Sequence, residues 1–223
     1  EPAACNSQAA SPFGRLNNFC LTFRGYFKNC LAVVFEGMKS IWSCFSNWKC
    51  GSGGRAAAAL LGMVMQGHGS VLPILGQRSG HYADSQRFTG FSTEMAESFP
   101  DIRVLHPECS FLDESLSERI AMRAIQSDSE LRGIYLTSAG REGVYRAVHA
   151  ADRSEKLHIV VHDITEGNIK MVKNGTVDFI IGQDVKTQGT LPIRLLYDYL
   201  ERHQFPKERM NITDITVKFR CNV

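Results

Sequence analysis

Hydrogen-bonding side chains follow four short apolar segments between residues 70 and 184. These segments are SVLPILG, GIYL, LHIVVH and VDFIIG. The polar residues are Gln77, Arg78, Ser79, Tyr82, Asp84 and Arg87 after the first segment, Thr137 and Ser138 after the second, Asp163 after the third, and Gln183 and Asp184 after the fourth. Hydroxyl groups both donate and accept hydrogen bonds, and arginine and aspartate can each bind two adjacent hydroxyls. The mixture therefore suits a polyhydroxylated ligand.

The same positions also have a purely structural interpretation. Polar residues follow strands in most α/β proteins and often cap the next helix, and we interpret Asp84 and Thr165 in this way. His162 and Asp163 are adjacent, and neighbours on a strand point to opposite faces, so they do not predict a catalytic dyad. The sequence has no G-x-S-x-G, H-E-x-x-H or P-loop motif. An enzyme on a doubly wound sheet is therefore the least favoured of three function classes.

Strand and helix patterns alternate from residue 55 to residue 219. The alanine-rich segment 55–66 predicts a helix, and further helices are expected between the strands. The predicted strands cover residues 70–76, 102–106, 133–137, 157–162, 177–182 and 214–219. Nearly continuous apolar strands separated by helices are typical of an open, mostly parallel α/β sheet with helices on both faces. In such sheets, ligands bind beyond the carboxyl ends of the strands.

Several local features refine this prediction. Pro73 conflicts with its place in an apolar strand, because proline cannot donate a hydrogen bond to a neighbouring strand. Ser115 and Glu118 form a predicted capping box at the start of a helix. Asn174 and Gly175 are expected to end the short helix that Thr165 begins. The helix over about 185–202 carries an apolar stripe of Ile193, Leu196, Tyr197 and Leu200.

Composition excludes some classes of protein and leaves others open. A formal net charge of +2 over 223 residues gives no electrostatic support for DNA binding by these residues. No run of about 18 apolar residues is present, so no membrane span is expected. The N-terminus has no signal-peptide pattern, which favours a cytoplasmic protein. The cysteine spacings match no common zinc site, so we expect no metal and no cofactor.

Residues 1–53 differ from the rest of the chain and stay unassigned. They contain five of the seven cysteines, both tryptophans and six of the thirteen phenylalanines, with no sustained helical or strand period. Three interpretations are open: a small hydrophobic subdomain, a membrane-surface or partner-binding segment, or a stretch translated in the wrong frame or from outside the native gene. We place the boundary at GSGG, residues 51–54.

From Gly54 to about residue 219 the sequence resembles lactose-repressor-type (LacI/GalR) bacterial transcription regulators. The segments GRAAAALLGMVMQGHGSVLPILG, YADSQRFTGF, GIYLTSAGREGVYRAV and LHIVVHDITEGNIKMVKNGTVDFIIGQDVKTQG match the C-terminal lobe of their effector domain in order. The closest resemblance is to members that are similar to periplasmic sugar-binding proteins. It implies a periplasmic-binding-protein-like type I lobe over 54–219, with the helix over about 185–202 packing on the other lobe.

The resemblance implies roles for individual residues. Arg87 matches an arginine that such proteins use on sugar hydroxyls, and Asp163 matches their ligand-binding aspartate. Gln183 matches a polar residue at the hinge that often reaches the ligand. Thr137 lies where many members carry Asn or Asp, so its role is less defined. The expected ligand-binding residues are thus Arg87, Asp163, Gln183, Thr137, Ser138, Arg78 and Tyr82.

Two binding functions share this expected site. The first is the sugar-sensing domain of a transcription regulator, a homodimer that contacts DNA only through a head domain that we do not find here. The alternative is a periplasmic sugar-binding protein of an ABC transporter. The N-terminal lobe of the family is also missing from residues 1–53, so we expect a fragment or damaged version of a longer protein.

Overall fold

The computed structural model describes residues 50–76, 82–153, 157–202, 204 and 214–223. The chain divides into two compact units, and each is described by itself. The larger unit comprises residues 47–188 and 212–223, and the other comprises residues 1–46 and 189–211. The Cys-, Phe- and Trp-rich segment therefore lies outside the described residues up to position 49, as do Gln77, Arg78 and Ser79.

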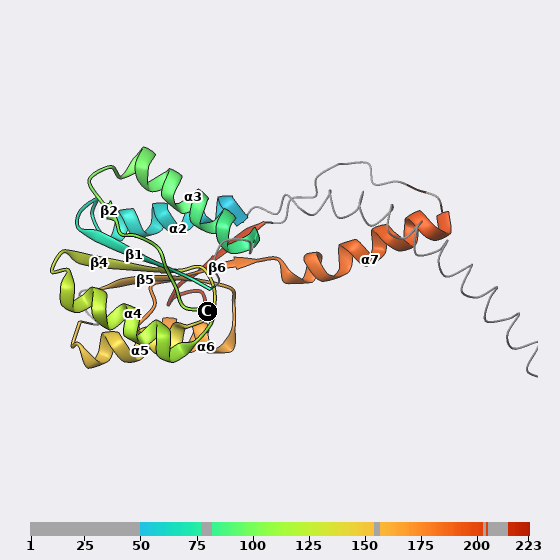
Figure 1. Ribbon diagram of the computed structural model, residues 1–223. Coiled ribbons are helices and arrows are strands. Elements are labelled where there is room, and N and C mark those ends of the chain that lie inside the picture. The colour runs from blue at the N-terminus through green and yellow to red at the C-terminus, as the bar shows by residue number, and fades with distance from the viewer. Residues whose placement is uncertain (1–49, 77–81, 154–156, 203, 205–213) are drawn as a thin grey trace, which may run out of the picture. The chain divides into compact units, whose positions relative to one another are not determined.

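A mostly parallel sheet forms the centre of the larger unit (Figure 1). Its strands run in the spatial order β2-β1-β4-β5-β6-β7, and β3 also pairs with β1. All pairs are parallel except β6 with β7. The strands are β1 (Ser70–Leu75), β2 (Arg103–Val104), β3 (Glu108–Cys109), β4 (Leu131–Leu136), β5 (His158–His162), β6 (Phe179–Gln183) and β7 (Ile215–Lys218). This confirms the predicted α/β class and its mostly parallel sheet.

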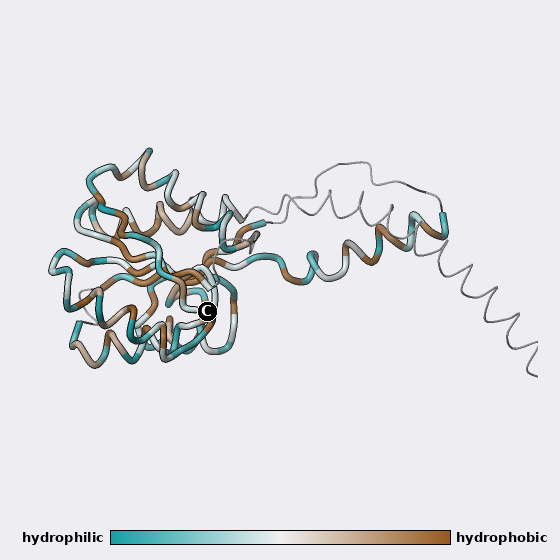
Figure 2. Tube along the Cα trace, viewed as in Figure 1, coloured by the Kyte–Doolittle hydropathy of each residue, from teal (hydrophilic) through white to brown (hydrophobic). Residues whose placement is uncertain are grey.

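Helices cover both faces of the sheet, and each face has its own core. Helices α2 (Cys50–Val64) and α3 (Tyr82–Ser98) lie on one face, and α4 (Glu114–Ser127), α5 (Arg141–Ala150) and α6 (Glu166–Lys173) lie on the other (Figure 1). The strands between them are the most apolar part of the unit (Figure 2). Ile134, Leu136 and Ile159 pack toward α4 and α5, whereas Tyr135 and Val160 pack toward α2 and α3. This alternation follows the two-residue period of a strand.

The glycines of GSGG, at positions 51, 53 and 54, belong to a helix. They lie inside α2, where Gly51 and Gly54 allow this helix to approach α3 closely. A Cβ at Gly54 would lie 1.9 Å from the Arg87 carbonyl oxygen, and one at Gly90 would lie 2.0 Å from the Gly51 carbonyl oxygen. The predicted start of the helix at Arg55 is therefore too late, and the contact fixes the turn of α3 that carries Arg87.

Pro73 lies within β1 without disrupting the sheet. Val71 and Leu75 accept hydrogen bonds from Leu105 and Ser110, on the side of β2 and β3. Alternate residues of a strand direct their backbone groups to the same side, so the nitrogen of Pro73 also faces that side. The chain on that side is interrupted between β2 and β3, so no strand there requires a backbone N–H from residue 73. The predicted strand over 102–106 is correspondingly shorter, because β2 contains only Arg103 and Val104.

The ends of two helices test the predicted caps. Asp113 caps α4, because its Oδ1 accepts a hydrogen bond from the Leu116 N–H at 2.6 Å. The predicted capping box of Ser115 and Glu118 is therefore wrong, because it places the N-cap two residues too late. Thr165 caps α6 as predicted, with its hydroxyl accepting from the Asn168 N–H at 3.2 Å. Gly175, in the left-handed region at φ +85°, follows the end of that helix.

Helix α7 (Val185–Arg202) follows β6 directly and matches the predicted helix. Its residues from Gly189 onward belong to the smaller unit, of which they are the main described part. Ile193 and Tyr197 of the predicted stripe are 70% and 55% exposed. The packing of this helix on a second lobe stays a prediction.

Candidate functional site

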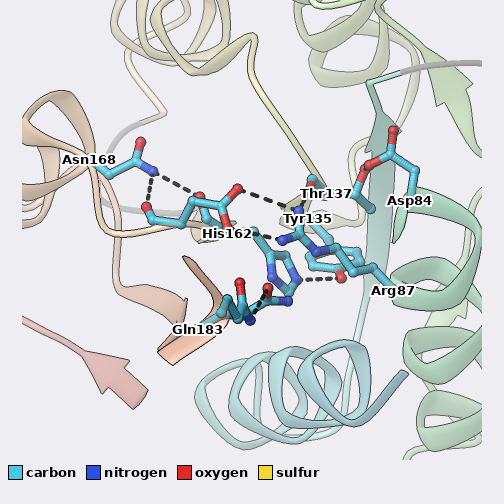
Figure 3. A network of polar contacts seen from close by, with 9 residues as sticks. Asp84, Arg87, Tyr135, Thr137, His162, Asn168 and Gln183 are labelled. Atoms are coloured by element: carbon cyan, nitrogen blue, oxygen red, sulfur yellow. Dashed lines mark hydrogen bonds and ion pairs between the residues drawn. The ribbon is translucent and has the colours of Figure 1, made fainter. Parts of the chain in front are cut away.

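The carboxyl ends of β4 and β5 and the first turns of α3 bring together Arg87, Thr137 and Asp163. Arg87 is only 6% exposed. Its Nη2 lies 3.0 Å from Asp163 Oδ1, and its Nη1 donates a hydrogen bond to the Thr137 carbonyl oxygen and lies 3.5 Å from Asp163 Oδ2 (Figure 3). Three of the predicted site residues therefore share one cluster, although they are 26 or more positions apart in the sequence.

The two members of the Arg87–Asp163 ion pair differ in their exposure to solvent. The Arg87 side chain is 7% exposed, whereas the Asp163 side chain is 48% exposed. Burying a guanidinium group requires a compensating charge or hydrogen bonds, which Asp163 and Thr137 supply. The Nε of Arg87 is buried and has no hydrogen-bond partner in the part of the chain that the structure describes. The carboxylate is therefore the member of the pair that can meet a ligand without rearrangement.

Thr137 supports the cluster from within. It is fully buried, and its hydroxyl donates a hydrogen bond to Asp84 Oδ1 at 2.9 Å (Figure 3). Asp84 itself is 2% exposed, in the first turn of α3. Asp84 was interpreted as a helix cap, but it is the third residue of α3, and its carboxylate ties this helix to the end of β4. In this arrangement Thr137 uses its hydroxyl and its carbonyl inside the protein.

An unusual backbone conformation at Asp163 sets the direction of its side chain. Its φ is +72°, in the left-handed region that residues other than glycine seldom adopt. Its N–H donates to the Ile181 carbonyl oxygen at 2.9 Å, and its own carbonyl accepts from the Thr165 N–H at 3.0 Å. The strand pairing of β5 with β6 and the start of α6 therefore both hold the turn that presents this carboxylate.

His162 and Tyr135 form a buried polar pair next to the cluster. His162 Nε2 lies 2.8 Å from the Tyr135 hydroxyl, and Phe91 stacks on the Tyr135 ring at 4.2 Å between centroids. Burial lowers the pKa of His162 well below its usual value of 6.5, and the positive charge of Arg87 lowers it further. The imidazole is therefore neutral at ordinary pH. As expected from the strand alternation, His162 and Asp163 have different partners and form no dyad.

The other predicted site residues have different surroundings. Gln183, half-buried at the end of β6, accepts a hydrogen bond from the Gln188 Nε2 at 3.1 Å. Asp184 accepts a hydrogen bond from the Thr187 N–H at 3.0 Å, and hydrogen bonds from the side chain and then the backbone of Thr187 lower the pKa of Asp184. Half-buried Ser138 lies beside the end of β1, since a Cβ at Gly76 would lie 2.6 Å from its Cβ. Tyr82 begins α3, but its side chain, like all of Arg78, lies outside the described residues.

Sequence reasoning missed three residues around the cluster. Tyr135 was predicted only as part of an apolar strand, and His162 was considered only as a partner of Asp163 in a dyad, which was not expected. Asn168 lay in a predicted short helix without an assigned role. Asn168 is 3% exposed and donates to the carbonyl oxygens of His162 and Asp163. A polar residue at an inward-facing helix position, three residues after a Thr cap, is the signal that could have identified it.

Neither a metal site nor a membrane span is found among the described residues. No group of three or more His, Cys, Asp or Glu side chains there is arranged to hold a metal ion. None of the described helices combines the length and the hydropathy needed to cross a bilayer. The cluster around Arg87 and Asp163 is thus a set of hydrogen-bonding and charged groups at the edge of a sheet.

The chain belongs to the periplasmic binding protein domain family, whose model matches residues 52–204. Solved structures agree with this assignment. A sugar-binding protein of a sugar ABC transporter from Bacillus halodurans is 25% identical, with a TM-score of 0.69 over 78% of this chain and 62% of that one. GanP, a glucose-galactose binding protein from Geobacillus stearothermophilus, is 19% identical, with a TM-score of 0.71 over 78% of this chain and 61% of that one.

A third similar structure is an ABC transporter solute-binding protein from Agrobacterium vitis bound with alpha-D-tagatopyranose. It is 24% identical, with a TM-score of 0.71 over 77% of this chain and 57% of that one. The chain thus spans about three fifths of the length of these structures. No curated protein matches it. Nothing in the family match or in these structures is specific to LacI/GalR regulators, and a transport binding protein fits them at least as well.

Proposed function

We propose that the chain is a sugar-binding lobe of a transport-linked binding protein. The observation that carries this proposal is the Arg87–Asp163 pair at the carboxyl ends of β4 and β5, with a buried guanidinium and a half-exposed carboxylate. A carboxylate held by an arginine is a fixed acceptor for two adjacent hydroxyl groups of a sugar ring. The fold places it where open α/β sheets bind ligands.

The similar structures support the choice of ligand class and of role. They include a glucose-galactose binding protein, an arabinose binding protein, and two ABC transporter solute-binding proteins bound with tagatose or allose. The arginine, carboxylate and amide groups of this chain suit the same chemistry. A regulator would use the same residues, so the site does not separate the two roles. A DNA-binding head and a homodimer belong only to the regulator alternative.

The cellular location distinguishes these two roles. A transport-linked protein acts outside the cytoplasmic membrane, whereas a regulator acts in the cytoplasm, as the sequence pattern alone suggested. Fractionation of cells that express the complete gene, followed by detection of the protein, tests this directly. Recovery only from the cytoplasmic fraction would favour the regulator.

Sugar binding is tested by calorimetric titration of the full chain with D-glucose, D-galactose, D-ribose, D-xylose and L-arabinose. Asp163→Asn removes the charge of the exposed acceptor and keeps its shape. A hydrogen bond to a charged group contributes about 1.5–3 kcal/mol, so the affinity for the sugar that binds should fall roughly 10- to 150-fold. Arg87→Lys should also weaken binding, because lysine cannot hold the carboxylate with two parallel donors.

A second arginine–aspartate pair provides a matched control. Arg103 Nη2 lies 2.9 Å from Asp128 Oδ2, and this pair belongs to the first residue of β2 and the C-cap of α4. The Arg103→Lys variant should bind sugar as the wild type does. Unchanged titration heats for Asp163→Asn and Arg87→Lys, with both proteins folded, would refute the proposed site.

A further inference from the structure

The turn between β5 and α6 places Asp163 in a backbone conformation that needs support. Aspartate tolerates the left-handed region better than most residues, but the conformation is still strained relative to glycine. Such strain persists where the surrounding contacts hold the chain in place. Asp163 has two backbone contacts of this kind, to Ile181 and Thr165.

Asn168 supplies a third contact, which bridges two successive carbonyl groups. Its Nδ2 donates to the His162 carbonyl oxygen at 2.9 Å and to the Asp163 carbonyl oxygen at 2.7 Å (Figure 3). Successive carbonyl groups of a straight strand point to opposite sides. One amide group can reach both only because the chain turns at Asp163, so these two hydrogen bonds stabilise the turned form specifically.

The chemistry of the contact leaves a single orientation for the carboxamide. Both acceptors are carbonyl oxygens, so the NH₂ group must face them, and the oxygen must face away. That Oδ1 is buried and has no hydrogen-bond partner in the part of the chain that the structure describes. Asn168 therefore leaves one polar atom unsatisfied while it holds the turn.

Helix capping does not explain this side chain. The Asn168 N–H is already satisfied by the Thr165 hydroxyl, which caps α6. The carboxamide instead reaches back from the helix to the end of the strand. Asn168 lies on the first turn of α6, and this helix is held in place because its Met171 and Val172 are buried in the core.

We propose that Asn168 is a positioning residue of the site: it holds Asp163 in its left-handed conformation and so directs the carboxylate toward Arg87. This inference rests on the proposed function, because the Asp163 carboxylate that Asn168 directs is the group proposed to bind the sugar. Asn168 itself touches no ligand in this assignment. Its effect on binding passes through Asp163.

A double-mutant cycle tests this coupling with the monosaccharides named above. Asn168→Ala should weaken sugar binding about tenfold in the wild-type background. In the Asp163→Ala background the same change should alter the residual affinity less than about twofold, because the group that Asn168 positions is gone. Equal losses in both backgrounds would overturn the proposal, since they would show a general structural effect.

A measurement without sugar separates this proposal from the proposed function. Amide hydrogen exchange of Asp163 and Thr165 should speed up about tenfold in Asn168→Ala, and much less when Asp163→Gly has already relieved the strained backbone. Asn174→Ala, at the other end of α6, is the control and should leave both amides unchanged. If exchange at the turn is unaffected by Asn168→Ala, the proposal fails even if the sugar binds at Asp163. If exchange responds but no sugar binds, only the proposed function fails.

Discussion

Acidification should destabilise this protein through His162, and the size of the effect follows from its surroundings. The imidazole is 2% exposed, its Nε2 is hydrogen-bonded to Tyr135, and Arg87 places a positive charge nearby. Burial, and then the positive charge of Arg87, lower the pKa of His162 in the folded state well below 6.5. In the unfolded chain the same imidazole should titrate near pH 6.5. The unfolded state therefore binds a proton first as the pH falls.

The sign and the magnitude come from this difference in proton binding. Below pH 6.5 the unfolded state carries one more proton at this site, so the free energy of unfolding falls as the pH falls. The slope approaches about 1.4 kcal/mol per pH unit, and it continues until the pH reaches the lowered pKa of the folded state. Between about pH 7.5 and pH 5.5, His162 alone should remove about 1.4 kcal/mol of stability.

Urea unfolding at the two pH values measures this contribution when His162→Gln is compared with the wild type. Glutamine can still reach the Tyr135 hydroxyl, but it does not titrate. The other ionisable groups are the same in both proteins, so the difference between their pH slopes isolates His162. The variant should lose about 1.4 kcal/mol less stability over this range. Equal slopes for the two proteins would show that His162 is accessible to protons in the folded state, and the reasoning would be refuted.

Two further predictions concern the elements that carry the site. Gly54→Ala should destabilise the protein by about 1–3 kcal/mol or more, because the new Cβ would lie 1.9 Å from the Arg87 carbonyl oxygen; Gly189→Ala, with open space around it, should be neutral or stabilising in thermal unfolding. Asp113→Ala should cost about 1 kcal/mol through loss of the α4 cap, whereas Ser115→Ala should change the unfolding midpoint little. A larger loss for Ser115→Ala than for Asp113→Ala would contradict the observed cap.

Local sequence patterns determined most of the elements of this protein. The apolar segments that became β1, β4, β5 and β6 were identified because strands buried on both faces need continuous apolar residues. The short helix begun by Thr165 and ended at Asn174 was identified because its capping signals are local. The order of these elements was enough to predict a mostly parallel sheet and the edge where polar residues gather.

The tertiary structure decided what depends on contacts between distant segments. The sequence placed a boundary at GSGG because the Cys-, Phe- and Trp-rich composition ends there, and it predicted the first helix only from Arg55. The structure uses Gly54 and Gly90 to bring two helices close together, a role that is visible only when both are in place. Pro73 conflicted with its strand until the interruption between β2 and β3 was seen beside it.

The candidate site shows the same division. Arg87, Thr137 and Asp163 were chosen from their positions after apolar segments, and the structure brings them together. Which of them is buried and which is open was not predictable, because burial depends on the helices that pack around each side chain. Residue types and their periodicity determine the helices and strands, and with them the end of the sheet where polar residues gather, because these features depend on residues close together in the chain. The direction of each polar group was set by packing across the sheet, where Asp84, Tyr135 and Asn168 meet their partners.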